Sequence, residues 1–197
     1  MKLTIKNAFI TLEKYLKPID EARFHHSFRV AKISAMLAKK WHASPTDAII
    51  AGLLHDIGKS VSPKQMLELC SKKNLPLYDF EIFETHSALH SQVSRIIFEE
   101  LFDNSDITRF NAISHAIFCH NTGDSNMSLL DKIIFIADNI EPNRKNNFLA
   151  KIQANELTSP DECIRLIIDT KMKRATQKNR EFNPLLGATL KSLENER

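Results

Sequence analysis

Several histidines and aspartates stand where the sequence is otherwise apolar, and their side chains are of the types that bind metal ions. The set comprises His26, His55, Asp56, His90, His120 and Asp138. An ionised carboxylate on an apolar helix face is costly unless a cation or strong donors meet it, and metal coordination would supply a partner to every member of the set. Nitrogen and oxygen ligands without a thiolate favour one or two ions such as iron or manganese over a structural zinc ion.

The stretch "GLLHDIGK", residues 52–59, sets His55 beside Asp56 at the end of an apolar run. Neighbouring side chains on a helix point about 100° apart, so both can reach one ion only where the helix ends. We expect Gly58 to provide that break.

Helical periodicity places the other candidates on apolar faces or at helix ends. His26 shares a face with Val30 and Leu37, and Asp138 closes the apolar run "LLDKIIFIAD". His90 heads a similar stripe, although His86 is an alternative ligand one turn earlier, and His120 ends the helix "AISHAIFCH". Each residue also has an ordinary interpretation. A lone histidine on such a face is more often a satisfied core residue, Asp138 could be an exposed acid at a helix end, and His55 and Asp56 could form a local hydrogen-bonded pair.

Apolar residues recur at helical spacing almost throughout, and no sustained alternation typical of strands occurs, so the predicted fold class is all-α. Serines followed by proline, as at Ser44, Ser62 and Ser159, are typical of helix starts. The expected helices span about 4–16, 21–41, 45–56, 63–73, 80–101, 108–120, 128–139 and 160–178, with a shorter one near 185–194. The basic stretch 171–180 is expected to be a solvated face, and His115 an ordinary surface histidine.

The composition narrows the class of protein. The 197 residues, of which 43% are hydrophobic and 26% charged, suit a single compact helical domain. The net charge of +3 is scattered along the chain, which gives no nucleic-acid-binding stripe. No run of about 18 apolar residues and no signal peptide occurs, so we expect a cytoplasmic protein without a membrane segment. The three cysteines, none in a CxxC spacing, are expected to be reduced structural thiols.

The spacing of His26, His55-Asp56 and Asp138 resembles the H…HD…D signature of the HD-domain metal-dependent phosphohydrolases. The sequence resembles more closely the bacterial YqeK family, HD-domain enzymes that act as symmetrical diadenosine tetraphosphate (Ap4A) hydrolases. The stretches "RFHHSFRVA", "AGLLHDIGK", "LHSQVS" and "AIFCHNTGDSNMSLLDKIIFIADNIEPNRK" carry this resemblance. The chain departs from the family pattern at Asn121, Asn139 and Asn143, none of which is a candidate ligand.

The resemblance implies an HD-domain helical bundle. Residues 1–197 would form a single HD phosphohydrolase domain, with a core at about 20–145 and C-terminal helices at 158–195 packing on it. The implied activity is hydrolysis of Ap4A to two ADP by a metal-activated water, with iron as one or two ions, or with manganese or another divalent metal in its place. A homodimer is expected from the family likeness alone.

Carried over position by position, the resemblance implies roles for individual residues. The metal ligands would be His26, His55, Asp56, His90, His120 and Asp138, with Asp56 between two ions; His55, Asp56 and Lys59 would act in catalysis; and Arg23, Lys59, His90, His120, Thr122 and Gly123 would contact the nucleotide or its phosphates. Arg144 is a further candidate for phosphate binding.

Two alternatives remain at this point. The chain could be another HD-type nucleotide phosphohydrolase, such as a nucleotidase, a deoxynucleoside triphosphate hydrolase or a cyclic-dinucleotide phosphodiesterase. The wording "HDIGK" is shared with the HD-GYP phosphodiesterases, but a "GYP" tripeptide is absent here. Alternatively, the chain could be a non-catalytic module that binds a metal ion and a nucleotide to regulate a partner protein.

Overall fold

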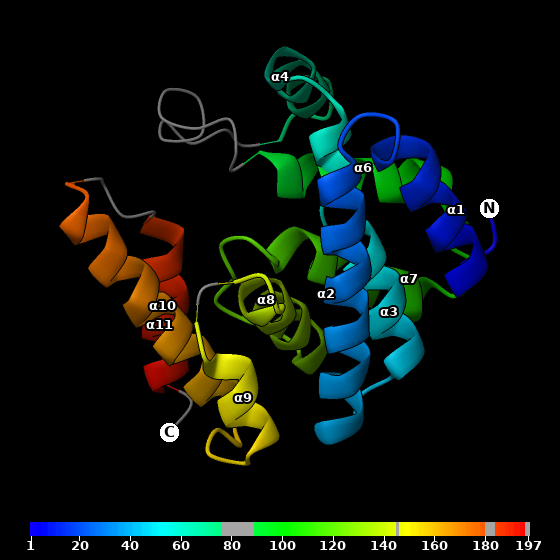
Figure 1. Ribbon diagram of the computed structural model, residues 1–197. Helices are drawn as coiled ribbons and strands as arrows, with labels where there is room; N and C mark the ends of the chain where they lie inside the picture. Colours follow the sequence, from blue (N-terminus) through cyan, green and yellow to red (C-terminus); the bar gives the residue numbers. More distant parts are fainter. Residues whose placement is uncertain (76–88, 145, 180–183, 196–197) are drawn as a thin grey trace.

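A computed structural model describes residues 1–75, 89–144, 146–179 and 184–195, which form helices and connecting turns without a strand (Figure 1). The helices are α1 (Ile5–Leu16), α2 (Glu21–Lys40), α3 (Pro45–Leu54), α4 (Pro63–Lys72), α6 (His90–Leu101), α7 (Ile107–Cys119), α8 (Leu129–Ile140), α9 (Phe148–Gln153), α10 (Pro160–Gln177) and α11 (Pro184–Asn195), and a short 3₁₀ helix, η1 (Ile57–Ser60), follows α3. The predicted all-α class is confirmed. None of the described helices is both long and apolar enough to cross a membrane.

The helices begin where local capping chemistry favours a start. The side chains of Ser44, Ser62 and Ser128 each accept a hydrogen bond from the backbone amide three residues later. Ser62 and Ser128 form full capping boxes, in which the side chain of the third helical residue also accepts a hydrogen bond from the backbone amide of the cap. Ser159 precedes a proline as predicted but makes no such side-chain bond.

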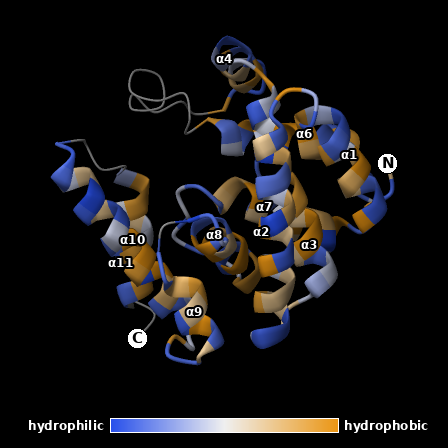
Figure 2. Ribbon diagram, viewed as in Figure 1, coloured by the Kyte–Doolittle hydropathy of each residue, from blue (hydrophilic) through white to orange (hydrophobic). Residues whose placement is uncertain are grey.

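The centre of the fold is the packing of α2 against α3 and α8 (Figure 1). Around this unit, α6 packs against α7 and η1, and α10 packs against α8 and α11 on the side of α8 away from α3 (Figure 1). The central helices α3 and α8 are largely apolar (Figure 2), and their buried hydrophobic residues belong to a cluster that also includes residues of α1, α2, α6, α7 and α10. This arrangement brings the start of α6 and the ends of α3, α7 and α8 near the first half of α2.

Two details of the predicted elements are corrected by the structure. The helix predicted over 45–56 ends at Leu54, before the histidine, and η1 continues the chain through Gly58, which does not adopt a positive φ. Gly58 therefore does not break the helix. A short helix over 148–153, α9, was not predicted, because the preceding "NIEPNRKNN" has the composition of a loop. Residues 80–88 of the helix predicted over 80–101, including His86, lie outside the described residues, and α6 begins at His90.

Candidate metal centre

The six candidate ligands converge although they come from five parts of the chain. His26 lies on α2, His90 begins α6 and Asp138 lies in the last turn of α8. The other three directly follow helices: His55 and Asp56 come after α3, and His120 comes after α7. All except Asp138 are buried. The groups His26, His55 and Asp138, and His55, Asp56 and His120, each place their ligand atoms within 4.8 Å of one another.

Asp56 occupies the middle of this cluster. Its Oδ1 atom lies 3.2 Å from Nε2 of His90 and 3.6 Å from Nε2 of His120. Its Oδ2 atom lies 3.6 Å from Nε2 of His55 and 3.8 Å from Nε2 of His26. The two oxygens of one carboxylate thus face two different pairs of imidazoles, as a carboxylate between two cations would.

Asp138 completes the group on the side of His26. Its Oδ1 atom lies 3.0 Å from Nε2 of His26 and 3.8 Å from Nε2 of His55. Arg144 folds back onto it, with Nη2 2.6 Å from the same oxygen and Nε donating to the Asp138 backbone carbonyl at 2.8 Å. The guanidinium group therefore holds the carboxylate from outside while the imidazoles face it from inside.

Hydrogen bonds to the outer ring nitrogens fix which nitrogen of each imidazole faces the cluster. Nδ1 of His55 lies 2.8 Å from the Gly52 carbonyl, and Nδ1 of His120 lies 2.7 Å from the Ile117 carbonyl. A carbonyl oxygen only accepts, so Nδ1 carries the proton and Nε2 presents its lone pair to the cluster. This is the arrangement typical of metal-binding histidines.

Several polar atoms at the centre are left without a hydrogen bond by the described residues. They are Nε2 of His26, Nε2 of His55 and Oδ1 of Asp56, which have charged neighbours at ion-pair distance but none in hydrogen-bond geometry. In addition, Nε2 of His90 lies 2.9 Å from Nε2 of His120. Buried polar atoms without partners are costly, and converging lone pairs on imidazole and carboxylate groups are what a divalent cation requires. The residues present therefore fit a divalent metal centre.

The ionisation of the cluster also suits metal binding. Burial lowers the pKa of His55 to about 3, and burial likewise lowers the pKa of His90. Burial by itself raises the pKa of Asp56, but the neighbouring His55, His120 and His90 outweigh it and hold that pKa well below its usual range. At neutral pH His55 and His90 are therefore neutral and Asp56 is ionised, and these are the forms that bind metal ions.

The cations predicted to contact phosphate reach the same cluster. Nη1 of Arg23 donates to Oδ2 of Asp56 at 2.9 Å, and Nζ of Lys59 lies 2.9 Å from Oδ1 of the same residue. About a third of each cationic side chain remains exposed, 32% for Arg23 and 27% for Lys59. Both groups thus connect the buried carboxylate to the surface from which a ligand would enter.

Comparison with known proteins places this arrangement in a family. Residues 23–143, more than half of the chain, match the HD domain. The chain belongs to the HD-domain family. The match contains all six candidate ligands, and it ends before α9, α10 and α11.

Individual relatives agree with this assignment. A protein of Halalkalibacterium halodurans named symmetrical bis(5'-nucleosyl)-tetraphosphatase is 31% identical over 90% of this chain and 92% of its own length. A Mycoplasma genitalium protein named probable nicotinate-nucleotide adenylyltransferase/Ap4A hydrolase is 30% identical over 73% of this chain, which spans 40% of that relative. These similarities confirm the resemblance to the tetraphosphatases.

A solved structure confirms the HD fold. It is a predicted HD superfamily hydrolase involved in NAD metabolism from Clostridium acetobutylicum, and its TM-score is 0.83 at 26% identity. The likeness covers 98% of this chain and 97% of that one, so it extends beyond the residues that match the HD domain. Family and relatives together support a hydrolase of the HD class that acts on nucleotide phosphates.

Glu141 and its partner Arg29 support the centre but were not predicted as site residues. The buried Glu141 lies 3.4 Å from Nδ1 of His26, accepts a hydrogen bond from Nε of Arg29 at 2.7 Å and accepts another from the backbone amide of Asn143. Burial raises the pKa of Glu141, but Arg29 and Asn143 outweigh it and lower that pKa overall. A negative Glu141 orients His26 from outside the cluster. The only signal in the sequence was its place in "IEP", directly after the candidate ligands.

We expect Glu141→Gln to weaken metal binding about tenfold, because the His26 imidazole loses a charged acceptor. The measurement is a competition titration of Mn²⁺ against a chelator of known affinity. Glu13→Gln is the matched control, since Glu13 pairs with Lys17 on the exposed surface of α1. Equal metal affinity in the two variants would contradict a supporting role for Glu141.

Thr122 and Gly123, predicted to contact the nucleotide, form a turn that packs against α11. Gly123 has a φ of +71°, and a Cβ atom there would lie 2.6 Å from the Thr189 side chain, so both conformation and space require glycine. The Thr189 hydroxyl donates to the Thr122 carbonyl at 2.9 Å. A cavity of about 320 Å³ adjoins this turn, with Gln92 of α6 and Phe118 of α7 in its wall.

His115 lies outside the metal centre but is more than the surface histidine that we expected. Its Nδ1 lies 2.9 Å from Oδ2 of the buried Asp131, and its Nε2 lies 3.3 Å from Asp124. The Cys119 sulfur is 3.4 Å from one ring nitrogen and 3.7 Å from the other. A sulfur nearly equidistant from both nitrogens does not lie in line with either lone pair. His115 is therefore an ion-pairing residue, and Cys119 is a buried thiol as predicted.

The His115 pair predicts a pH-dependent contribution to stability. The hydrogen bond with Asp131 raises the pKa of His115 above its ordinary value of 6.5. The contribution is then fully present below pH 6.5 and is lost as the pH rises through the higher folded-state pKa. In urea unfolding of metal-free protein, we expect His115→Gln to be less stable than wild type at pH 5.5, by under about 1 kcal/mol because the ring is partly exposed. The difference should shrink by pH 9. A constant difference, or the same trend in the exposed His25→Gln control, would contradict the pairing.

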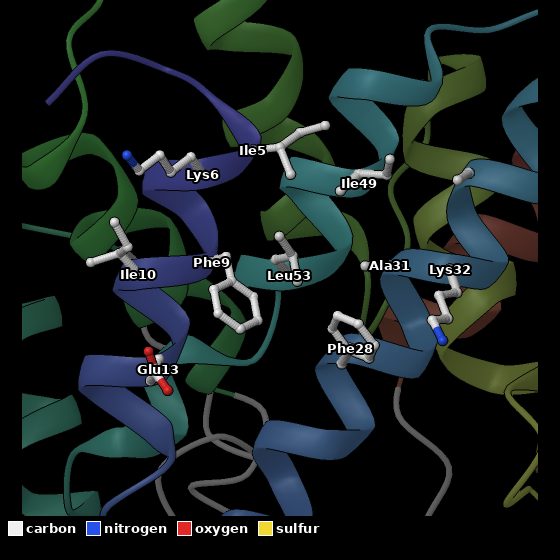
Figure 3. A pocket seen from close by; sticks show the side chains of 11 residues that line it. Ile5, Lys6, Phe9, Ile10, Glu13, Phe28, Ala31, Lys32, Ile49 and Leu53 are labelled. Atoms are coloured by element: carbon white, nitrogen blue, oxygen red, sulfur yellow. The ribbon is translucent and has the colours of Figure 1, made fainter.

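An apolar groove elsewhere in the molecule is less suited to a phosphate ligand. It has a volume of about 630 Å³ and lies where α1 meets α2 and α3, with Phe9, Phe28 and Leu53 around its centre (Figure 3). None of the six candidate ligands is among the residues that line it. A polyanion would find mainly hydrocarbon there, so the metal centre is the candidate site for nucleotide chemistry.

Proposed function

We propose that this HD-domain protein is a metal-dependent hydrolase that cleaves Ap4A symmetrically into two molecules of ADP. The observation that carries the proposal is the position of Asp56, whose two oxygens face separate pairs of imidazoles while Arg23 and Lys59 approach it from the surface. The tetraphosphatase names of relatives that cover most of the chain support the choice of substrate.

Specific residues would hold the metal ions. His26, His55 and Asp138 would bind one ion, His90 and His120 the other, and Asp56 would contact both. Iron is the proposed metal, with manganese as a substitute. A divalent ion bound there would supply a water molecule of lowered pKa and would neutralise phosphate oxygens.

Arg23 and Lys59 would act on the substrate from the surface of the site. Each donates to the Asp56 carboxylate. Metal ions in the site would neutralise that carboxylate instead, so both cations could bind phosphate oxygens. In symmetrical cleavage, the water oxygen adds to an inner phosphorus atom and the bond from that phosphorus to the central bridging oxygen breaks. The second ADP leaves with the electron pair, positive charge at Arg23 and Lys59 stabilises it, and the proton lost by the attacking water passes to the solvent.

The cavity beside the Thr122–Gly123 turn is the proposed place for one nucleoside. The turn follows His120 directly, so a group in the cavity would be adjacent to a phosphate at the centre. Gln92 offers an amide and Phe118 an aromatic ring, the two kinds of group that recognise a base edge and a base face.

Product analysis tests the proposal. Purified protein is incubated with Ap4A and Fe²⁺ or Mn²⁺ under reducing conditions, and the nucleotides are separated by ion-exchange chromatography. ADP as the sole product is expected. ATP and AMP in equal amounts would retain a metal-dependent hydrolase but reject the symmetrical bond. No turnover by a metal-loaded protein would reject this substrate, and trials of other nucleotide phosphates would then separate another HD phosphohydrolase from a regulatory module.

A further inference from the structure

Helix α11 supplies part of the wall of the cavity beside the Thr122–Gly123 turn. Leu185, Ala188 and Thr189 line the cavity from α11, and the other described residues of its wall belong to α6, α7 and the turn. α11 lies beyond residues 23–143, which match the HD domain, and it is held there by α10, which packs against both α8 and α11 (Figure 1). The proposed nucleoside cavity is therefore bordered by a segment outside the HD match.

The three α11 residues that line the cavity share one face of the helix. Leu185, Ala188 and Thr189 are spaced i, i+3 and i+4, and this spacing places side chains on the same side of a helix. Gly187 does not line the cavity, and a Cβ atom there would meet nothing within 4 Å. Substitutions at neighbouring positions of α11 therefore reach either the cavity or open space.

Thr189 fixes this face of α11 against the turn. Its side chain is buried, and its hydroxyl donates to the Thr122 carbonyl at 2.9 Å. Ala188, the preceding residue, is exposed although it borders the cavity. A small side chain thus stands where the cavity opens, and the contact of Thr189 holds it in that place.

The groups that line the cavity suit a neutral base better than a phosphate. None of the described residues in its wall is a lysine or an arginine, and Asp124 is an acid. The Phe118 ring of α7 offers an aromatic surface, and Leu185 and Ala188 of α11 offer an aliphatic one. A nucleobase binds to such surfaces through its flat face, and that contact does not require charge.

We propose that α11 makes the site selective for phosphates that carry a nucleoside, with Leu185 and Ala188 in contact with the base and with a small side chain required at position 188. The inference rests on the proposed function, which places one nucleoside in this cavity. Phosphate groups would be held by the metal centre and by Arg23 and Lys59, all within the HD match. α11 therefore contributes to binding of the nucleoside and not of the phosphates, so inorganic polyphosphates gain nothing from it.

The test measures binding of ADP and of inorganic pyrophosphate to Mn²⁺-loaded protein by calorimetry, because the two ligands share a diphosphate and differ by the nucleoside. We expect Ala188→Phe to weaken ADP binding about tenfold, since the new ring fills the space of the base, and to leave pyrophosphate binding unchanged. Ala188→Ser adds one atom and should bind both ligands like wild type. Gly187→Phe is the matched control, because it places the same ring on the same helix outside the cavity.

These binding measurements separate failure of this inference from failure of the proposed function, since they hold even if Ap4A is not hydrolysed. Equal ADP affinity in Ala188→Phe and wild type would overturn the role of α11, whatever the activity toward Ap4A. A parallel loss of ADP and pyrophosphate binding would also overturn it, by assigning the effect to the metal centre. The same loss of ADP binding in Gly187→Phe would do so too, by assigning the effect to the packing of α11.

Discussion

Replacing Asp56 by asparagine is expected to reduce hydrolysis of Ap4A about a thousandfold or more. Asp56 is the one candidate ligand that faces both pairs of imidazoles, and an amide cannot supply the negative charge that two cations would share. The variant should also retain less metal after dialysis, as measured by elemental analysis. Asp138→Ala should behave similarly, because the His26 side of the centre loses its carboxylate.

His115→Ala is the matched control for these two variants. His115 pairs with Asp131 and Asp124 outside the cluster, so its loss should leave most of the activity and the metal content. Equal activity in the variants at Asp56, Asp138 and His115 would contradict the assignment of the site.

Replacing Gly58 by alanine is expected to destabilise the fold by about 3 kcal/mol and to displace His90. A Cβ atom at residue 58 would lie 2.3 Å from the His90 carbonyl oxygen and 2.7 Å from the Ser94 amide nitrogen. Both are backbone atoms at the start of α6, so no side chain can turn aside. The Gly58 amide also donates to the Ser94 hydroxyl at 2.8 Å, which fixes η1 against α6. Urea unfolding of the metal-free protein measures the loss.

Gly187→Ala is the control for the backbone effect of glycine. Gly187 lies within α11, and a Cβ atom there would meet nothing within 4 Å. Alanine favours a helix over glycine by up to about 1 kcal/mol, so this variant should be slightly more stable than wild type. A similar, small effect at both glycines would show that Gly58 is not needed for the close approach of η1 and α6.

Local sequence patterns were sufficient for most helices and for the candidate ligands. Ser62 and Ser128 mark helix starts because a cap needs only residues within one turn. His26 and His90 could be placed on buried faces because helical periodicity fixes which side chains share a face. A buried carboxylate such as Asp56 requires partners, and the histidines on other apolar faces were the available candidates.

The tertiary structure decided which groups meet across the fold. From the sequence, Gly58 was expected to end a helix. In the structure its lack of a side chain allows α6 to approach closely, and no local sequence pattern encodes that contact. Glu141 supports His26 only because α2 and α8 pack together. Sequence by itself therefore determined most helices and the candidate ligands, because helix caps and helix faces depend on neighbours within about one helical turn. The supporting contacts depend on packing between distant segments, which only the folded chain defines.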